Sequence, residues 1–92
     1  MFALKFEIRA TANNTNMFVE QETVVNVSLN ERATIDKACM IGMSSFATPR
    51  EMKAASEFLN INLLKIKSEQ KFEEVTSAPL TRGSYRILAK RV

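Results

Sequence analysis

Histidine and tryptophan are absent from this 92-residue sequence, and cysteine occurs once, as Cys39. Without histidine the chain lacks the usual general base at neutral pH, and no Ser-His or Cys-His nucleophile pair can form. A single thiol cannot close an intramolecular disulfide, and no cluster of thiols, imidazoles and carboxylates offers a zinc site. We therefore expect no catalytic residue, no metal and no cofactor, so the protein is predicted not to be an enzyme.

Glycine and proline are also scarce, with two of each, which predicts few, fairly long and closely connected elements. A chain of 92 residues with 46% apolar and 25% charged residues is typical of one globular domain, here residues 1–92. Charges are interleaved with the apolar residues after Met1, unlike a secretory leader or a membrane span. We expect a cytoplasmic protein that does not associate with membranes.

Charge is distributed unevenly along the sequence. Residues 1–47 hold four cations and five anions, whereas residues 48–92 hold nine cations and five anions. The net charge of +3 is ordinary for a soluble protein, so this asymmetry is the one electrostatic indication of where a partner binds.

The N-terminal part of the sequence has the period of β-strands. Phe2, Leu4, Phe6, Ile8 and Ala10 share one face of residues 2–10, and Lys5, Glu7 and Arg9 point the other way, which is typical of a half-buried strand. Asn and Thr gather in residues 11–16 and predict a hairpin loop, and a second strand is predicted from Phe18 to Leu29.

The period then changes to that of helices. We expect a helix beginning at Asn30 as N-cap, with a buried stripe of Ile35, Ala38, Cys39, Gly42 and Phe46. Cys39 is interpreted as a small core residue and Gly42 as a point of close approach between helix and sheet. Met40, Ile41 and Met43 widen the stripe; we interpret its second half as buried, the alternative being an exposed, adaptable methionine surface together with Met52.

A second helix is predicted to begin after Thr48, because Thr48, Pro49 and Glu51 match a capping box with proline at the first helical position. This helix is expected to end near Asn60. Residues 61–68 suit either a continued helix or a strand, and the strand is favoured because Asn60 and Asn62 are poor helix formers.

The C-terminal part is again predicted to be β. Residues 71–77 form a short strand or a turn, residues 78–83 a loop marked by Pro79 and Gly83, and residues 84–92 a strand. The predicted fold is α+β: an antiparallel sheet of four or five strands, in the order β-β-α-α-β-(β)-β, with both helices packed on one face.

The candidate binding site is the basic stretch RGSYRILAKRV at residues 82–92. It contains four cations, one tyrosine and no carboxylate, and Lys65 and Lys67 are among the lysines that precede it in the basic half. An ordinary edge strand, blunted by charge against aggregation, is the competing interpretation. The predicted partner-binding residues are Arg82, Tyr85, Arg86, Lys90, Arg91, Lys65 and Lys67.

Two hypotheses for function follow from this composition. The leading one is a small non-catalytic binding protein that regulates or inhibits a larger protein, or a protein–nucleic acid complex, by occluding its surface. Phage-encoded inhibitors of host machinery, including anti-defence proteins, share this size and this lack of motifs. The alternative is direct, weakly specific binding of RNA or DNA by the basic half. It is disfavoured because one tyrosine offers little stacking surface for single strands.

Overall fold

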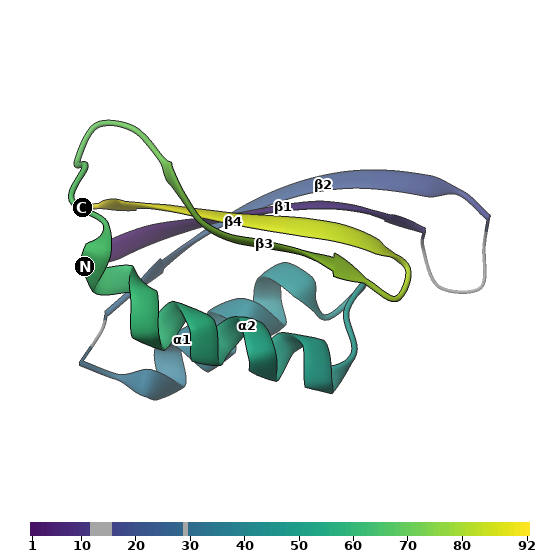
Figure 1. Cartoon of the computed structure of the whole chain (residues 1–92), viewed down its shortest axis with the longest axis horizontal. Coiled ribbons are helices and arrows are strands. Elements are labelled where there is room, and N and C mark those ends of the chain that lie inside the picture. Colours follow the sequence, from purple (N-terminus) through teal and green to yellow (C-terminus); the bar gives the residue numbers. More distant parts are fainter. Residues whose placement is uncertain (12–15, 29) are drawn as a thin grey trace.

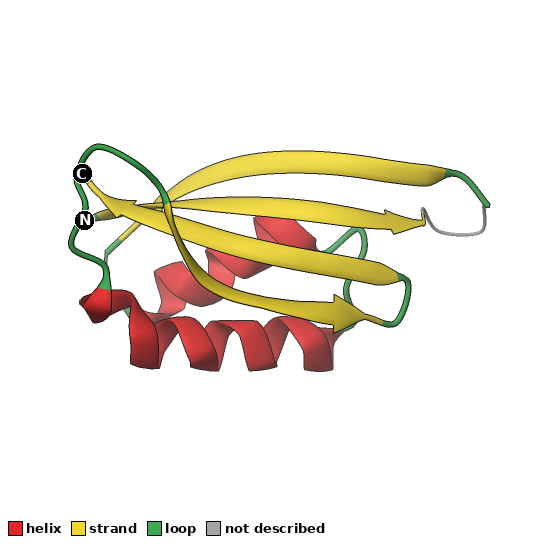
Figure 2. Ribbon diagram, turned by 45° about the horizontal axis from the view of Figure 1, so that its top comes forward, coloured by secondary structure: helices red, strands yellow, loops and turns green. Residues whose placement is uncertain are grey.

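The computed structural model describes residues 1–11, 16–28 and 30–92. Within these residues the chain forms a four-stranded antiparallel sheet in the order β2-β1-β4-β3 and two α-helices, followed by a 3₁₀ turn. The predicted α+β fold is confirmed, and both helices cover the same face of the sheet (Figures 1 and 2). The elements are β1 (Phe2–Thr11), β2 (Phe18–Val27), α1 (Arg32–Met43), α2 (Pro49–Asn62), the 3₁₀ turn (Leu63–Lys65), β3 (Glu73–Leu80) and β4 (Gly83–Arg91).

The core lies between the sheet and the helices. It follows from the alternation predicted for β1, in which every second side chain is buried against the helices. The stripe predicted for α1 is buried as well. Gly42 allows the closest approach, because a Cβ atom at this position would lie 2.5 Å from Cγ of Phe6. The role predicted for Gly42 is therefore confirmed.

β1 and β2 form a long hairpin that extends past the helices (Figure 1). Their register is unbroken over ten residue pairs, from Phe2 opposite Val27 to Thr11 opposite Phe18. The second strand ends at Val27 rather than at the predicted Leu29. Leu29 and most of the predicted loop, residues 12–15, lie outside the described residues.

α1 departs from its prediction in two ways. It begins at Arg32 after Glu31, and the predicted cap Asn30 instead donates its N–H to the Ser28 hydroxyl. The interpretation of the second half as buried is also wrong in part. Met43 is buried, but the side chains of Met40 and Ile41 are 59% and 53% exposed, because one stripe of the helix is enough to cover the sheet.

α2 begins as predicted. The Thr48 hydroxyl accepts a hydrogen bond from the Glu51 N–H (3.2 Å), and the Glu51 carboxylate accepts one from the Thr48 N–H (2.8 Å). The other Glu51 oxygen accepts from the Thr81 N–H at 2.7 Å, in the turn between β3 and β4. These bonds lower the pKa of Glu51, the one from the Thr48 N–H contributing most. One carboxylate therefore caps a helix and ties it to the sheet.

The strand predicted for residues 61–68 is not formed. α2 continues to Asn62 and passes into the 3₁₀ turn. The side-chain amides of Asn60 and Asn62 donate to the backbone carbonyls of Ser56 and Phe58, four residues earlier, which offsets their poor intrinsic helix propensity. Burial of Leu63 against the core extends the helical path.

The loop predicted for residues 78–83 is also wrong in its first part. β3 continues to Leu80, and the turn consists of Thr81 and Arg82. Pro79 is accommodated because β3 is an edge strand, where the missing N–H removes no ladder hydrogen bond.

Candidate partner-binding surfaces

The residues predicted to bind a partner are divided between the two faces of the sheet. We call the face that the helices leave uncovered the open face. Along β4, Arg86 and Lys90 point to the open face, and Tyr85 points toward the helices. The C-terminal strand therefore does not present its cations and its tyrosine together.

Both cations on the open face of β4 have intramolecular partners. The Arg86 Nη2 and Nε atoms lie 2.7 and 2.8 Å from Oε1 of Glu7, and its Nη1 lies 3.7 Å from Oε1 of Glu74. The hydrogen bond to Glu7 is the largest cause of the raised pKa of Arg86. The Lys90 ammonium lies 5.0 Å from the centre of the Phe72 ring, and the Lys5 ammonium lies 4.4 Å from it. These charges are engaged within the fold.

Tyr85 is 9% exposed and belongs to the core, and burial raises the pKa of its phenol. It cannot serve as a stacking surface. Arg91 is engaged as well: its Nε donates to the Ile66 carbonyl at 2.8 Å, and its guanidinium lies 4.9 Å from the Phe2 ring centre. Arg82 donates from Nη2 to the Ser45 carbonyl at 3.0 Å.

Lys65 and Lys67 are exposed at the end of α2, where the Lys65 Nζ donates to Oδ1 of Asn62 at 3.0 Å. The predicted residues thus lie on the open face, in the core, in the turn between β3 and β4, and at the end of the helical layer, where Arg91 bonds to Ile66 and Ser68. They do not form one basic surface.

The open face carries balanced charge. Among the described residues, its strands contribute four cations and four anions, which are Lys5, Arg9, Arg86, Lys90, Glu7, Glu20, Glu22 and Glu74. A sheet that binds single-stranded nucleic acid needs aromatic platforms and excess positive charge. The strands of the open face do not supply this excess of positive charge.

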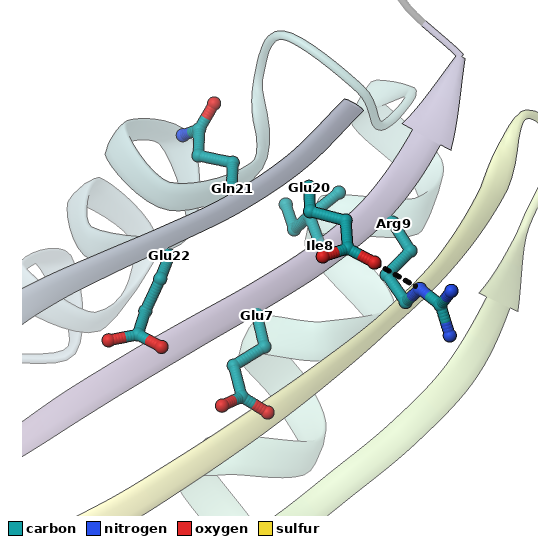
Figure 3. Close-up of a pocket in the computed structure, with 6 residues that line it drawn as sticks. All are labelled: Glu7, Ile8, Arg9, Glu20, Gln21 and Glu22. Atoms are coloured by element: carbon teal, nitrogen blue, oxygen red, sulfur yellow. Dashed lines mark ion pairs between the residues drawn. The ribbon is translucent and has the colours of Figure 1, made fainter. Parts of the chain in front are cut away.

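A shallow pocket of about 420 Å³ lies on the open face between β1 and β2 (Figure 3). Arg9 Nε and Glu20 Oε1 form an ion pair across it at 3.0 Å. Glu22 stands directly opposite Glu7, an arrangement of like charges that weakens a strand pair. Within the described part of the chain, no cation lies within 4.0 Å of the Glu22 carboxylate.

Sequence reasoning missed the edge of β2 as a candidate binding surface. β2 is one of the two outer strands of the sheet, and its side chains Phe18 and Val24 are 58% and 53% exposed on the open face. The available signal was composition: residues 10–31 contain three anions and no lysine or arginine.

A second hollow, of about 460 Å³, opens between α1 and α2. Met40 and Met52 line its apolar part, and Asp36 accepts a hydrogen bond from the Ser56 hydroxyl at its side. Its charged lining mixes both signs, with Arg32 and Lys53 beside Asp36 and Glu57. Of the three methionines in the alternative interpretation, Met40 and Met52 line this hollow and Met43 is buried in the core.

Cys39 is buried, and burial raises the pKa of its thiol to about 12, so it packs as an apolar residue. The described residues contain no group of three or more Cys, Asp or Glu side chains placed to hold a metal ion. In residues 1–11, 16–28 and 30–92 there is no helix both long and apolar enough to cross a bilayer.

The chain matches no family model, no curated protein and no solved structure.

Proposed function

We propose that the chain is a small non-catalytic binding protein that regulates or inhibits a larger protein partner by occluding part of its surface. The observation that carries this proposal is the outer edge of β2. This strand is ten residues long, its outer backbone is open to pairing, and two large apolar side chains stand exposed on it. Such an edge favours association with another polypeptide.

A protein alone and a protein within a nucleic acid complex both fit this proposal. Direct binding of RNA or DNA is the weaker candidate, because ion pairs and cation–π contacts already engage the cations of β4. Their engagement limits how many phosphates the chain neutralises without breaking its own contacts.

Capture of the tagged chain from its native host, with and without nuclease, tests this proposal. We expect a stoichiometric protein that stays bound after nuclease treatment and whose activity falls when purified chain is added. Mass spectrometry would identify the protein, and the ratio of absorbance at 260 and 280 nm would report nucleic acid. A high ratio without any retained protein would refute the proposal and favour direct nucleic acid binding.

The predicted cations provide a matched pair of variants for the same assay. Arg86→Glu/Lys90→Glu and Lys65→Glu/Lys67→Glu make the same change of charge at separate places. Circular dichroism would first establish that each variant is folded. Comparing their association rates with the captured partner shows which group steers the encounter, since charges at the rim of an interface act mainly on that rate.

A further inference from the structure

The two outer strands of the sheet differ in how well they are protected. Natural edge strands are blunted by proline, bulges, lysine or short length. β3 has eight residues, a bulge between Glu74 and Thr76, and Pro79. β2 has ten residues in unbroken register with β1, and it contains neither proline nor lysine. β2 is therefore the edge at which another strand can pair.

The charge of this edge indicates what kind of strand. Glu20 and Glu22 both point to the open face, and only Glu20 has a cation, Arg9, at 3.0 Å. Glu22 faces Glu7, whose carboxylate is already bound by Arg86. A lysine or arginine supplied by an added strand next to Glu22 would compensate this like-charge pair.

Apolar side chains flank the same edge on both sides of the sheet. Phe18 and Val24 are exposed on the open face. On the helix side, Ile41 of α1 comes five residues after Asp36, which faces α2 through Ser56. Five residues turn an α-helix by about 140° beyond one full turn, so Ile41 faces away from α2, on the flank of α1 near β2. A strand added next to β2 would therefore cover exposed apolar side chains on both sides of the sheet.

We propose that β2 binds an extended segment of the partner protein by strand addition, and that this segment carries lysine or arginine opposite Glu20 and Glu22 and apolar residues facing α1. The backbone hydrogen bonds of the new strand pair supply affinity, and the charges and apolar contacts set the register. This inference rests on the proposed function and identifies the partner's recognition element.

A second copy of this chain is the other strand that β2 could accept. Pairing of two β2 strands about a twofold axis normal to the sheet would bring Glu20 and Glu22 of both copies onto one face. The four carboxylates would be paired with only two cations, the Arg9 side chain of each copy. Charge therefore favours a basic partner segment over self-association.

Binding of a fluorescent peptide, Thr-Val-Lys-Val-Lys-Val-Thr, tests the inference by anisotropy and by amide chemical shifts. In a strand, its lysines share one face and its valines the other. We expect the peptide to bind, with the largest shifts in residues 18–27. Glu22→Lys should weaken binding about three- to tenfold, because it replaces a cross-strand attraction with a repulsion of similar size. Glu69→Lys, an equal charge change at an exposed loop position, should change binding less than twofold.

Three further measurements sharpen this result. A peptide with proline at the central valine should bind at least tenfold more weakly, and a peptide with glutamate for lysine should not bind. Sedimentation should show a monomer. No binding of the original peptide, equal effects of Glu22→Lys and Glu69→Lys, tolerance of proline, or a dimer lost in Val24→Lys would each overturn the inference.

Failure of this inference is distinguishable from failure of the proposed function. If a nuclease-resistant partner is captured but the β2 amides exchange with solvent equally fast in the free and bound chain, strand addition is refuted and the binding function stands. If no protein is captured at all, the proposed function itself is refuted.

Discussion

Substituting Gly42 with alanine tests how closely α1 approaches the sheet. The new Cβ would lie 2.5, 2.6 and 2.9 Å from three ring atoms of Phe6, a side chain that is 1% exposed and surrounded by core residues. In an exposed helix, replacing glycine with alanine stabilises by about 1 kcal/mol. Forcing a methyl group into a filled core costs about 1–3 kcal/mol, and contacts this short place Gly42→Ala at the upper end.

We therefore expect Gly42→Ala to lower the free energy of unfolding by about 1–2 kcal/mol, the clash outweighing the gain in helix propensity. For a domain of this size, that lowers Tm by on the order of 10 °C. Urea denaturation followed by circular dichroism measures the change. Phe6→Ala removes Cγ and both Cδ atoms, the three atoms that the new methyl group would meet, so Gly42→Ala should become neutral or stabilising in that background. An alanine variant as stable as the wild type, or equally destabilised in both backgrounds, would refute the reasoning.

Four other predictions concern single side chains. Thr48→Ala should lower the free energy of unfolding by about 1 kcal/mol through loss of the helix cap, and an unchanged denaturation midpoint would contradict this. Because the pKa of Glu51 is lowered from 4.5 in the folded chain, its charge stabilises the fold above pH 4.5, and this contribution is lost as pH falls through the lowered pKa. The stability gap between wild type and Glu51→Gln should therefore narrow in acid, and a gap independent of pH would be evidence against that role. Cys39 should resist alkylation at pH 8 until the chain is unfolded, since burial raises the pKa of its thiol to about 12; rapid labelling of the native chain would show otherwise. Arg86→Glu should lower the denaturation midpoint and Lys67→Glu should not, because of these two side chains only Arg86 forms ion pairs with carboxylates among the described residues.

The fold was predictable where side-chain period and local hydrogen bonding agree. The alternation in β1, the stripe of α1 and the capping box at Thr48 each specify one local structure, and each is confirmed. Prediction failed where long-range burial overrode local preference. Residues 61–68 are helical in their first part because Leu63 is buried and the Asn62 side chain donates to a backbone carbonyl. The helix propensities of single residues include neither effect.

The candidate site was less predictable than the fold. A cation's availability depends on which residues oppose it across the sheet, and that pairing is not encoded locally. Arg86 meets Glu7 although 79 residues separate them in the sequence. Which strand lies at the edge is likewise set by strand order, and the local sequence of β2 does not encode that β1 and β4 occupy the centre of the sheet.

This strand order also affects how the chain folds. The central pair of the sheet joins the two most distant strands in sequence, Phe2 lying opposite Arg91, and the Val92 N–H donates to the Met1 carbonyl at 3.0 Å (Figure 1). The β1–β4 pairing closes a loop roughly ten times longer than that of the β1–β2 hairpin, which costs about 2 kcal/mol more in chain entropy. High contact order of this kind slows folding, so each hairpin and the helical pair should form before they meet. A circular permutant joining residue 92 to residue 1 through a short linker, with its new ends placed between β1 and β2, would turn the slowest pairing into a hairpin.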